Sequence, residues 1–182
     1  MNFQGFIPLL ATVLGAIIAL GGAFWSTIVI ERRREKRQAK NLASAFYGEI
    51  TALRSIVEKR NYVDGLKQII SVMKTTGNPL QYDVPIEMRY FNVWKENVSN
   101  IGILEDPLPA DIAIFYTQCN SVLEDFKAIR DGVLDGSDVG ALIGFYNNLL
   151  ELLNDTLRLG EKILSRIAER YRLSVRDGNS IE

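Results

Sequence analysis

The sequence predicts an all-α protein, with one N-terminal transmembrane helix that continues into a cytoplasmic antiparallel bundle of about three to four helices. Residues 6–30 contain no charged side chain, and as a helix they would span roughly 37 Å at about 1.5 Å per residue. After residue 30, apolar residues recur at steps of three and four, the spacing of one helix face. Strand signals are weak, because no segment there alternates apolar and polar residues over more than about four positions.

Composition divides the chain into segments of different character. We expect a transmembrane anchor over residues 1–30, a basic juxtamembrane segment over 31–40, a cytoplasmic helical domain over 41–173 and a flexible polar tail over 174–182. A domain of this length has the usual size for a single hydrophobic core. A cleaved signal peptide is the competing interpretation of the first segment, but it needs a basic start and a shorter apolar core.

Basic charge is concentrated next to the predicted anchor. Residues 31–40 carry six basic and two acidic side chains, a balance of +4; because the net charge is −1 and residues 1–30 carry none, residues 41–182 sum to −5. The positive-inside rule places the N-terminus outside and the C-terminal domain in the cytoplasm. The acidic remainder lacks the basic face of a nucleic-acid-binding domain. We expect lipid head groups to contact Arg32, Arg33, Arg34, Lys36, Arg37 and Lys40.

Small side chains recur every four residues within the predicted anchor. Such a ridge lets two helix backbones approach closely, so it predicts a homo-oligomer formed in the membrane. Glycine and alanine are common in any spanning helix, so an anchor without self-association stays open. Trp25 lies one turn before the basic residues, where an amphipathic ring suits the membrane interface. The residues predicted to mediate membrane association are Ala11, Gly15, Ala19, Ala23 and Trp25.

Two helices are predicted after the basic segment. No proline or glycine interrupts residues 30–47, so the first helix would continue the anchor as a stalk, with Leu42, Phe46, Ile50, Leu53 and Val57 on its apolar face. Asparagine, aspartate and glycine over residues 61–65 weaken this helix. A second, shorter helix follows from residue 63 and ends at residues 75–79.

A loop and a short helix come next. Residues 77–90 contain Pro79 and Pro85 without a sustained period, which predicts the main loop. Residues 91–100 predict two or three helical turns, with Gly102 as their C-terminal cap. The break at residues 105–109 has the aspartate and prolines typical of a helix entry.

Two long helices complete the predicted bundle. The first shows apolar steps of three and four over residues 112–133. Residues 131–138 hold two glycines and three aspartates, which predicts a turn with Ser137 as the N-cap of the last helix. That helix covers about residues 138–171 and should pack against two neighbours. Its sevenfold repeat is Ile143, Leu150, Leu157, Leu164 and Tyr171, interleaved with Tyr146, Leu153, Gly160 and Ile167 and widened by Leu142, Leu149 and Ile163.

The residue types offer no visible catalytic constellation. The chain has no histidine, the commonest general base and metal ligand. Its single cysteine, Cys119, lies on an apolar stripe and is interpreted as a core residue rather than a nucleophile. Asp131, Asp135 and Asp138 lack the spacing of a calcium loop and suit a turn. We therefore predict no catalytic, cofactor-binding or metal-binding residue and no enzyme activity.

Two stretches resemble segments of small uncharacterised bacterial single-pass membrane proteins with a helical cytoplasmic domain. They are residues 46–50 with Leu53 and residues 61–62, and residues 97–104 with Leu108 and residues 114–116. The resemblance covers about half of the chain. It implies the same architecture and a bacterial inner membrane, and it implies no activity or catalytic residue. Gly48 departs from the alanine-like residue expected at that position.

These features predict a membrane-anchored cytoplasmic helical module for interaction or oligomerisation. Confining a domain to a membrane raises its effective concentration, so weak contacts suffice for binding. The expected partners are the lipid bilayer, a second copy of the chain, and a membrane or cytoplasmic protein. Two alternatives stay open: a membrane-disrupting effector of a stress or anti-phage response, and an accessory subunit of a membrane complex.

Overall fold

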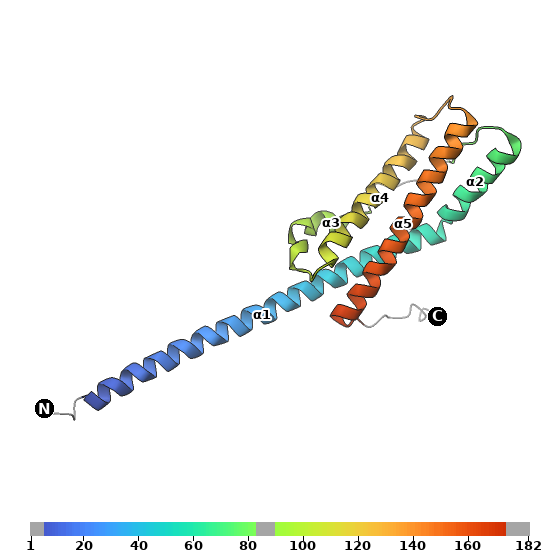
Figure 1. Ribbon diagram of the computed structural model, residues 1–182. Coiled ribbons are helices and arrows are strands. Elements are labelled where there is room, and N and C mark those ends of the chain that lie inside the picture. The colour runs from blue at the N-terminus through green and yellow to red at the C-terminus, as the bar shows by residue number, and fades with distance from the viewer. Residues whose placement is uncertain (1–5, 83–89, 174–182) are drawn as a thin grey trace. The chain divides into compact units, whose positions relative to one another are not determined.

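The computed structural model describes residues 6–82 and 90–173, and it describes side chains at Trp25 and from Ile28 onward within those ranges. All of its regular elements are helical, which confirms the all-α part of the predicted fold class. In chain order they are α1 (Phe6–Lys59), α2 (Tyr62–Thr76), α3 (Asn92–Asn97), the 3-10 helix η2 (Val98–Ile103), α4 (Leu108–Arg130) and α5 (Val139–Tyr171) (Figure 1). The polar tail, residues 174–182, lies outside the described residues.

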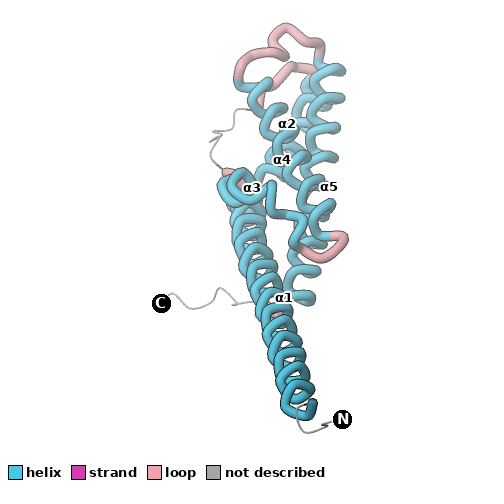
Figure 2. Tube along the Cα trace, turned by 90° about the vertical axis from the view of Figure 1, so that its left-hand side faces the viewer, coloured by secondary structure: helices cyan, strands magenta, loops and turns pink. Residues whose placement is uncertain are grey.

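The chain divides into two units, Met1–Lys40 and Asn41–Glu182. In the first unit, the residues from Phe6 onward belong to α1. In the second, the last part of α1 joins α2, α4 and α5, and the latter three lie side by side in both views (Figures 1 and 2). α5 contacts both α2 and α4 and runs antiparallel to each of them. The predicted helical bundle is therefore present in the second unit.

Helix α5 is the central element of this bundle. The Asp138 side chain accepts a hydrogen bond from the Ala141 N–H at 2.9 Å and caps the helix, so the predicted start at Ser137 is wrong by one residue. Its buried face alternates steps of four and three, as bundle packing requires. The buried residues are Leu142, Tyr146, Leu149, Leu153, Thr156, Gly160, Ile163 and Ile167. The predicted sevenfold series from Ile143 to Tyr171 is only half-buried, so the centre of the seam lies one residue earlier.

Two hydrophobic clusters share this seam. One joins the end of α5 to α1, α3 and the start of α4, and includes Phe46, Ile50 and Ile163. The other joins the start of α5 to α2 and the end of α4, and includes Leu66 and Phe126. The amphipathic faces predicted for α1, α2, α4 and α5 thus contribute to one bundle interior.

Several predicted boundaries agree with the structure and others need correction. α2 ends at Thr76 and is capped by Gly77, whose φ of 68° lies in the left-handed region that glycine adopts freely. Gly102 lies inside η2, and Leu104 follows that helix, so the predicted glycine cap is wrong. α4 ends at Arg130 because residues 131–136 form turns. Val133 is consequently 71% exposed and does not belong to the buried stripe.

Candidate functional site

The predicted lipid-contacting residues all lie on α1 with exposed side chains. They are Arg32, Arg33, Arg34, Lys36, Arg37 and Lys40. Six cations on consecutive turns of one helix create a local positive potential that attracts anionic groups. The segment has the charge and the exposure that contact with lipid head groups requires.

The predicted membrane-association residues fall mostly outside the described side chains. These are Ala11, Gly15, Ala19 and Ala23, for which only the helical backbone of α1 is described. Trp25 is 72% exposed. Among the residues that the structure describes, no helix is both long and apolar enough to cross a membrane.

Glu49 organises the junction of α1, α3 and α4. Its carboxylate accepts hydrogen bonds from the Val93 N–H at 2.8 Å and the Trp94 N–H at 3.2 Å, so a side chain of α1 caps the first turn of α3. The Tyr116 hydroxyl of α4 donates a third hydrogen bond to the same carboxylate. The Trp94 and Tyr116 rings stack, with centroids 4.9 Å apart. Glu49 therefore ties three elements together.

The surroundings of Glu49 make two neighbouring groups hard to ionise. Burial raises the pKa of the Tyr116 hydroxyl far above its usual range, and the hydrogen bond to the Glu49 carboxylate raises it further. Burial also raises the pKa of the Cys119 thiol to about 12, with a smaller contribution from the charge of Glu49. The thiolate is the nucleophilic form of cysteine, so Cys119 is unreactive at neutral pH.

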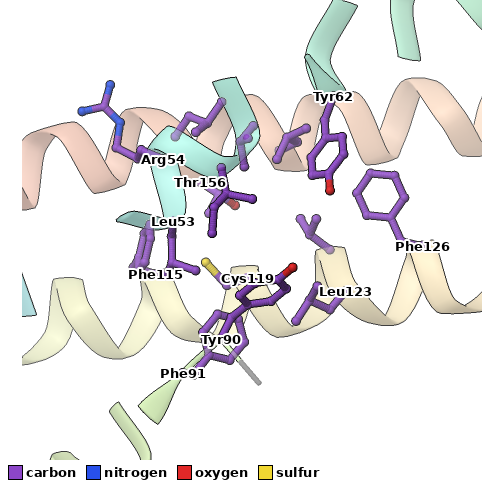
Figure 3. Close-up of a pocket in the computed structure, with 15 residues that line it drawn as sticks. Leu53, Arg54, Tyr62, Tyr90, Phe91, Phe115, Cys119, Leu123, Phe126 and Thr156 are labelled. Carbon is purple, nitrogen blue, oxygen red and sulfur yellow. The ribbon is translucent and has the colours of Figure 1, made fainter. Parts of the chain in front are cut away.

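An apolar cavity of about 80 Å³ lies inside the bundle, where the two hydrophobic clusters meet (Figure 3). Side chains from α1, α2, α4 and α5 and from residues 90–91 surround it. Aliphatic and aromatic groups form most of its wall, among them Leu53, Val57, Tyr62, Phe115, Phe126 and Leu153.

The cavity exists because two helices place small side chains in its wall. On α4, the side chains that face the cavity at steps of four and three include Phe115, Cys119, Val122 and Phe126, and Cys119 is the smallest of them. On α5, Thr156 occupies a position at which the preceding and following repeats carry Leu149 and Ile163. Figure 3 shows Cys119 and Thr156 on opposite helices beside the same space. Neither side chain is large enough to fill it.

The wall has few polar groups, and they differ in how they are paired. Arg54 also lines the cavity; its Nε is buried without a hydrogen-bond partner among the described residues, and its guanidinium group points away from the space in Figure 3. The Thr156 hydroxyl donates to the Leu152 carbonyl of its own helix at 2.7 Å. The Tyr62 hydroxyl accepts a hydrogen bond from Arg60 at 2.9 Å. A water molecule needs about two to four polar partners to remain in a buried site. The wall thus favours an apolar occupant over water.

Ion pairs join the start of α4 to the end of α5. Asp111, whose side chain is 13% exposed, pairs with Arg166 and lies 3.7 Å from the Lys162 ammonium group. Arg170 pairs with Glu105 at 2.9 Å and donates to the Asp106 carbonyl at 3.0 Å. These contacts fix one end of the α4–α5 pair, and Asp106, Arg166 and Arg170 also line a partly polar pocket there.

The turn between α4 and α5 places its three aspartates in separate local roles. Asp131 accepts from Arg130, Asp135 accepts from Gln81, and Asp138 caps α5. Within the described residues, no group of three or more cysteine, aspartate or glutamate side chains is arranged to hold a metal ion.

Sequence reasoning did not single out Glu49 or Thr156, although both carried a signal. Glu49 lies three residues after Phe46 and four before Leu53, on the apolar face of its helix. An acid at such a position requires hydrogen-bond partners from other elements. Thr156 lies seven residues from both Leu149 and Ile163, so the repeat itself identifies a small polar residue on the buried seam.

The second unit is thus an all-α bundle with a basic segment before it and an apolar cavity within it. Comparison with protein-family models, curated proteins and solved structures finds no match. The resemblance to bacterial single-pass membrane proteins stays a prediction from the sequence.

Proposed function

We propose that the chain is a membrane-tethered interaction module without enzymatic activity, in which residues 6–30 anchor a helical bundle that binds a second copy or another protein. The observation that carries the proposal is the order of features along α1. An uncharged apolar run of spanning length precedes six exposed basic side chains, which in turn precede the bundle. This order is typical of an anchor with its following domain on the cytoplasmic side.

Membrane attachment and orientation are tested together in cells. The full chain, fused at its C-terminus to a reporter active only in the cytoplasm, should resist extraction from membranes by alkaline carbonate and give an active reporter. The triple variant R32Q/R33Q/R34Q should leave a measurable fraction in the inverted orientation, because it removes half of the basic side chains beside the anchor. The control K67Q/K74Q/K127Q removes the same charge from exposed positions of the bundle. An extractable chain, or identical orientation in both variants, would contradict this part of the proposal.

Self-association is tested by the mass of the full chain in lipid nanodiscs. The small-residue ridge predicts an oligomer that Gly15→Ile or Ala19→Ile dissociates, because larger side chains keep the helix backbones apart. Gly21→Ile adds the same side chain on the opposite side of the helix, about 160° from Ala19, and serves as the control. A monomeric wild-type chain that also captures no partner from membrane extracts would argue against an interaction module.

A membrane-disrupting effector is the second candidate, and a different measurement separates it. Under induced expression, that function would depolarise cells containing a membrane-potential dye, whereas an interaction module would leave the potential unchanged. The predicted anchor contains no charged residue that could line an ion pathway.

A further inference from the structure

We propose that the cavity between α1, α2, α4 and α5 is a binding site for an uncharged aliphatic group of about three carbon atoms. This inference does not depend on the proposed membrane anchor, because every residue of the cavity wall belongs to the second unit. It concerns the region where the two hydrophobic clusters meet, which no predicted site included.

The small side chains beside the cavity come from two helices rather than from one. The apolar stripe of each helix has one small residue beside the cavity. These residues are Cys119 on α4 and Thr156 on α5. A leucine at either position would supply the missing volume, and leucine is the residue that the α5 repeat uses at Leu149. The wall therefore leaves open a volume that common substitutions could close.

The size and chemistry of the wall define the ligand class. A non-hydrogen atom with its hydrogens takes roughly the 30 Å³ that a water molecule occupies in the liquid, so 80 Å³ accommodates about three such groups. Most of the wall is aliphatic or aromatic, the Thr156 hydroxyl donates within its own helix, and the Arg54 guanidinium group points away from the space in Figure 3, so the site offers little to a charged ligand. The same aliphatic chemistry can come from a free small molecule or from the end of a longer acyl chain.

Methyl NMR spectra of the full chain in nanodiscs under xenon pressure test the site directly. Xenon is the probe because it occupies dry apolar cavities without hydrogen bonds. The methyl resonances of Leu53, Val57 and Val122 should shift with saturable dependence on pressure, since these residues form the wall. Resonances of Ile112 and Ile167, which are fully buried but not in the wall, should remain in place and also report that the bundle is folded.

Filling variants provide the decisive controls. Thr156→Leu and Cys119→Leu fill the space from opposite helices, and each should abolish the xenon shifts of the remaining wall residues. Thr156→Val keeps the size of the side chain and removes only the hydroxyl that donates to the Leu152 carbonyl, so it should retain the shifts. Thr117→Leu repeats the threonine-to-leucine exchange at an exposed position of α4 and should also retain them. Absent shifts in the wild type, shifts of equal size at Ile112, or shifts that persist in a folded filling variant would overturn the proposal.

A series of n-alkanes identifies the source of the aliphatic group. Saturation of the wall resonances by propane and butane, with no response to hexane or octane, supports a free small molecule. An equal response to the longer alkanes supports the end of an acyl chain, because the rest of the chain must then pass out of the cavity. No response to any alkane would contradict the site even if xenon enters it.

Discussion

The Glu49 carboxylate accepts a hydrogen bond from the Val93 N–H at 2.8 Å, across 44 positions of sequence. An ordinary N-cap lies next to the helix that it caps, and helix α3 is instead capped from α1. The position of this short helix therefore depends on a tertiary contact, because six residues do not form a stable helix alone.

Glu49→Ala is expected to destabilise the protein by about 2–3 kcal/mol. The substitution removes the cap, worth about 1 kcal/mol, and leaves the largely buried Tyr116 hydroxyl without its acceptor. Urea unfolding followed by circular dichroism measures the loss. Glu58→Gln alters an exposed acid of the same helix and should change stability by less than about 0.5 kcal/mol. Equal effects of the two variants would contradict the assigned role of Glu49.

Gly160→Ala and Gly144→Ala, both on α5, are expected to act in opposite directions. A Cβ at position 160 would lie 2.9 Å from the Cε2 of buried Phe115, so overpacking should cost about 1–3 kcal/mol before the gain in helix propensity. A Cβ at position 144 meets nothing within 4 Å and should stabilise the protein by up to about 1 kcal/mol. Thermal unfolding of the two variants distinguishes these signs. A stabilised Gly160→Ala variant would show that α4 and α5 are less closely packed.

Asp138→Ala should cost about 1 kcal/mol, whereas Ser137→Ala should be nearly neutral. The Asp138 carboxylate accepts from the Ala141 N–H, while the N-cap position is already filled when Ser137 is altered. Denaturant unfolding of both variants tests the corrected helix start. A larger effect at Ser137 would restore the start that the sequence predicts.

Cys119 is expected to react with thiol reagents only at high pH. Its thiol pKa is raised from 9.0 to about 12, so alkylation at pH 8 should be on the order of 10³-fold slower than in the urea-unfolded chain. Intact mass spectrometry over a pH series measures this rate for the single cysteine. The folded state retains the thiol proton while the unfolded state loses it, so the thiol's contribution lowers stability as pH rises from about 9 to 12. A reaction midpoint near 9 in the folded protein would contradict this environment.

Much of the bundle could be predicted from the sequence because its signals are local. The steps of three and four predicted α4 and α5 to within a few residues of their ends. The glycine after Thr76 predicted the end of α2. The apolar wall of the cavity could not be predicted, because it depends on which turns of the different helices pack against one another. The role of Glu49 was equally hidden, because its partners Val93 and Tyr116 lie on distant elements. Register between helices is a property of their packing, and periodicity alone does not report it.

Helix α5 contributes to both hydrophobic clusters, with Ile163 in one and Leu149 in the other. Neither cluster can lose its packing without exposing part of the same helix to solvent. The bundle should therefore melt in a single cooperative transition, with the amide protons of the middle of α5 exchanging only when the whole bundle opens.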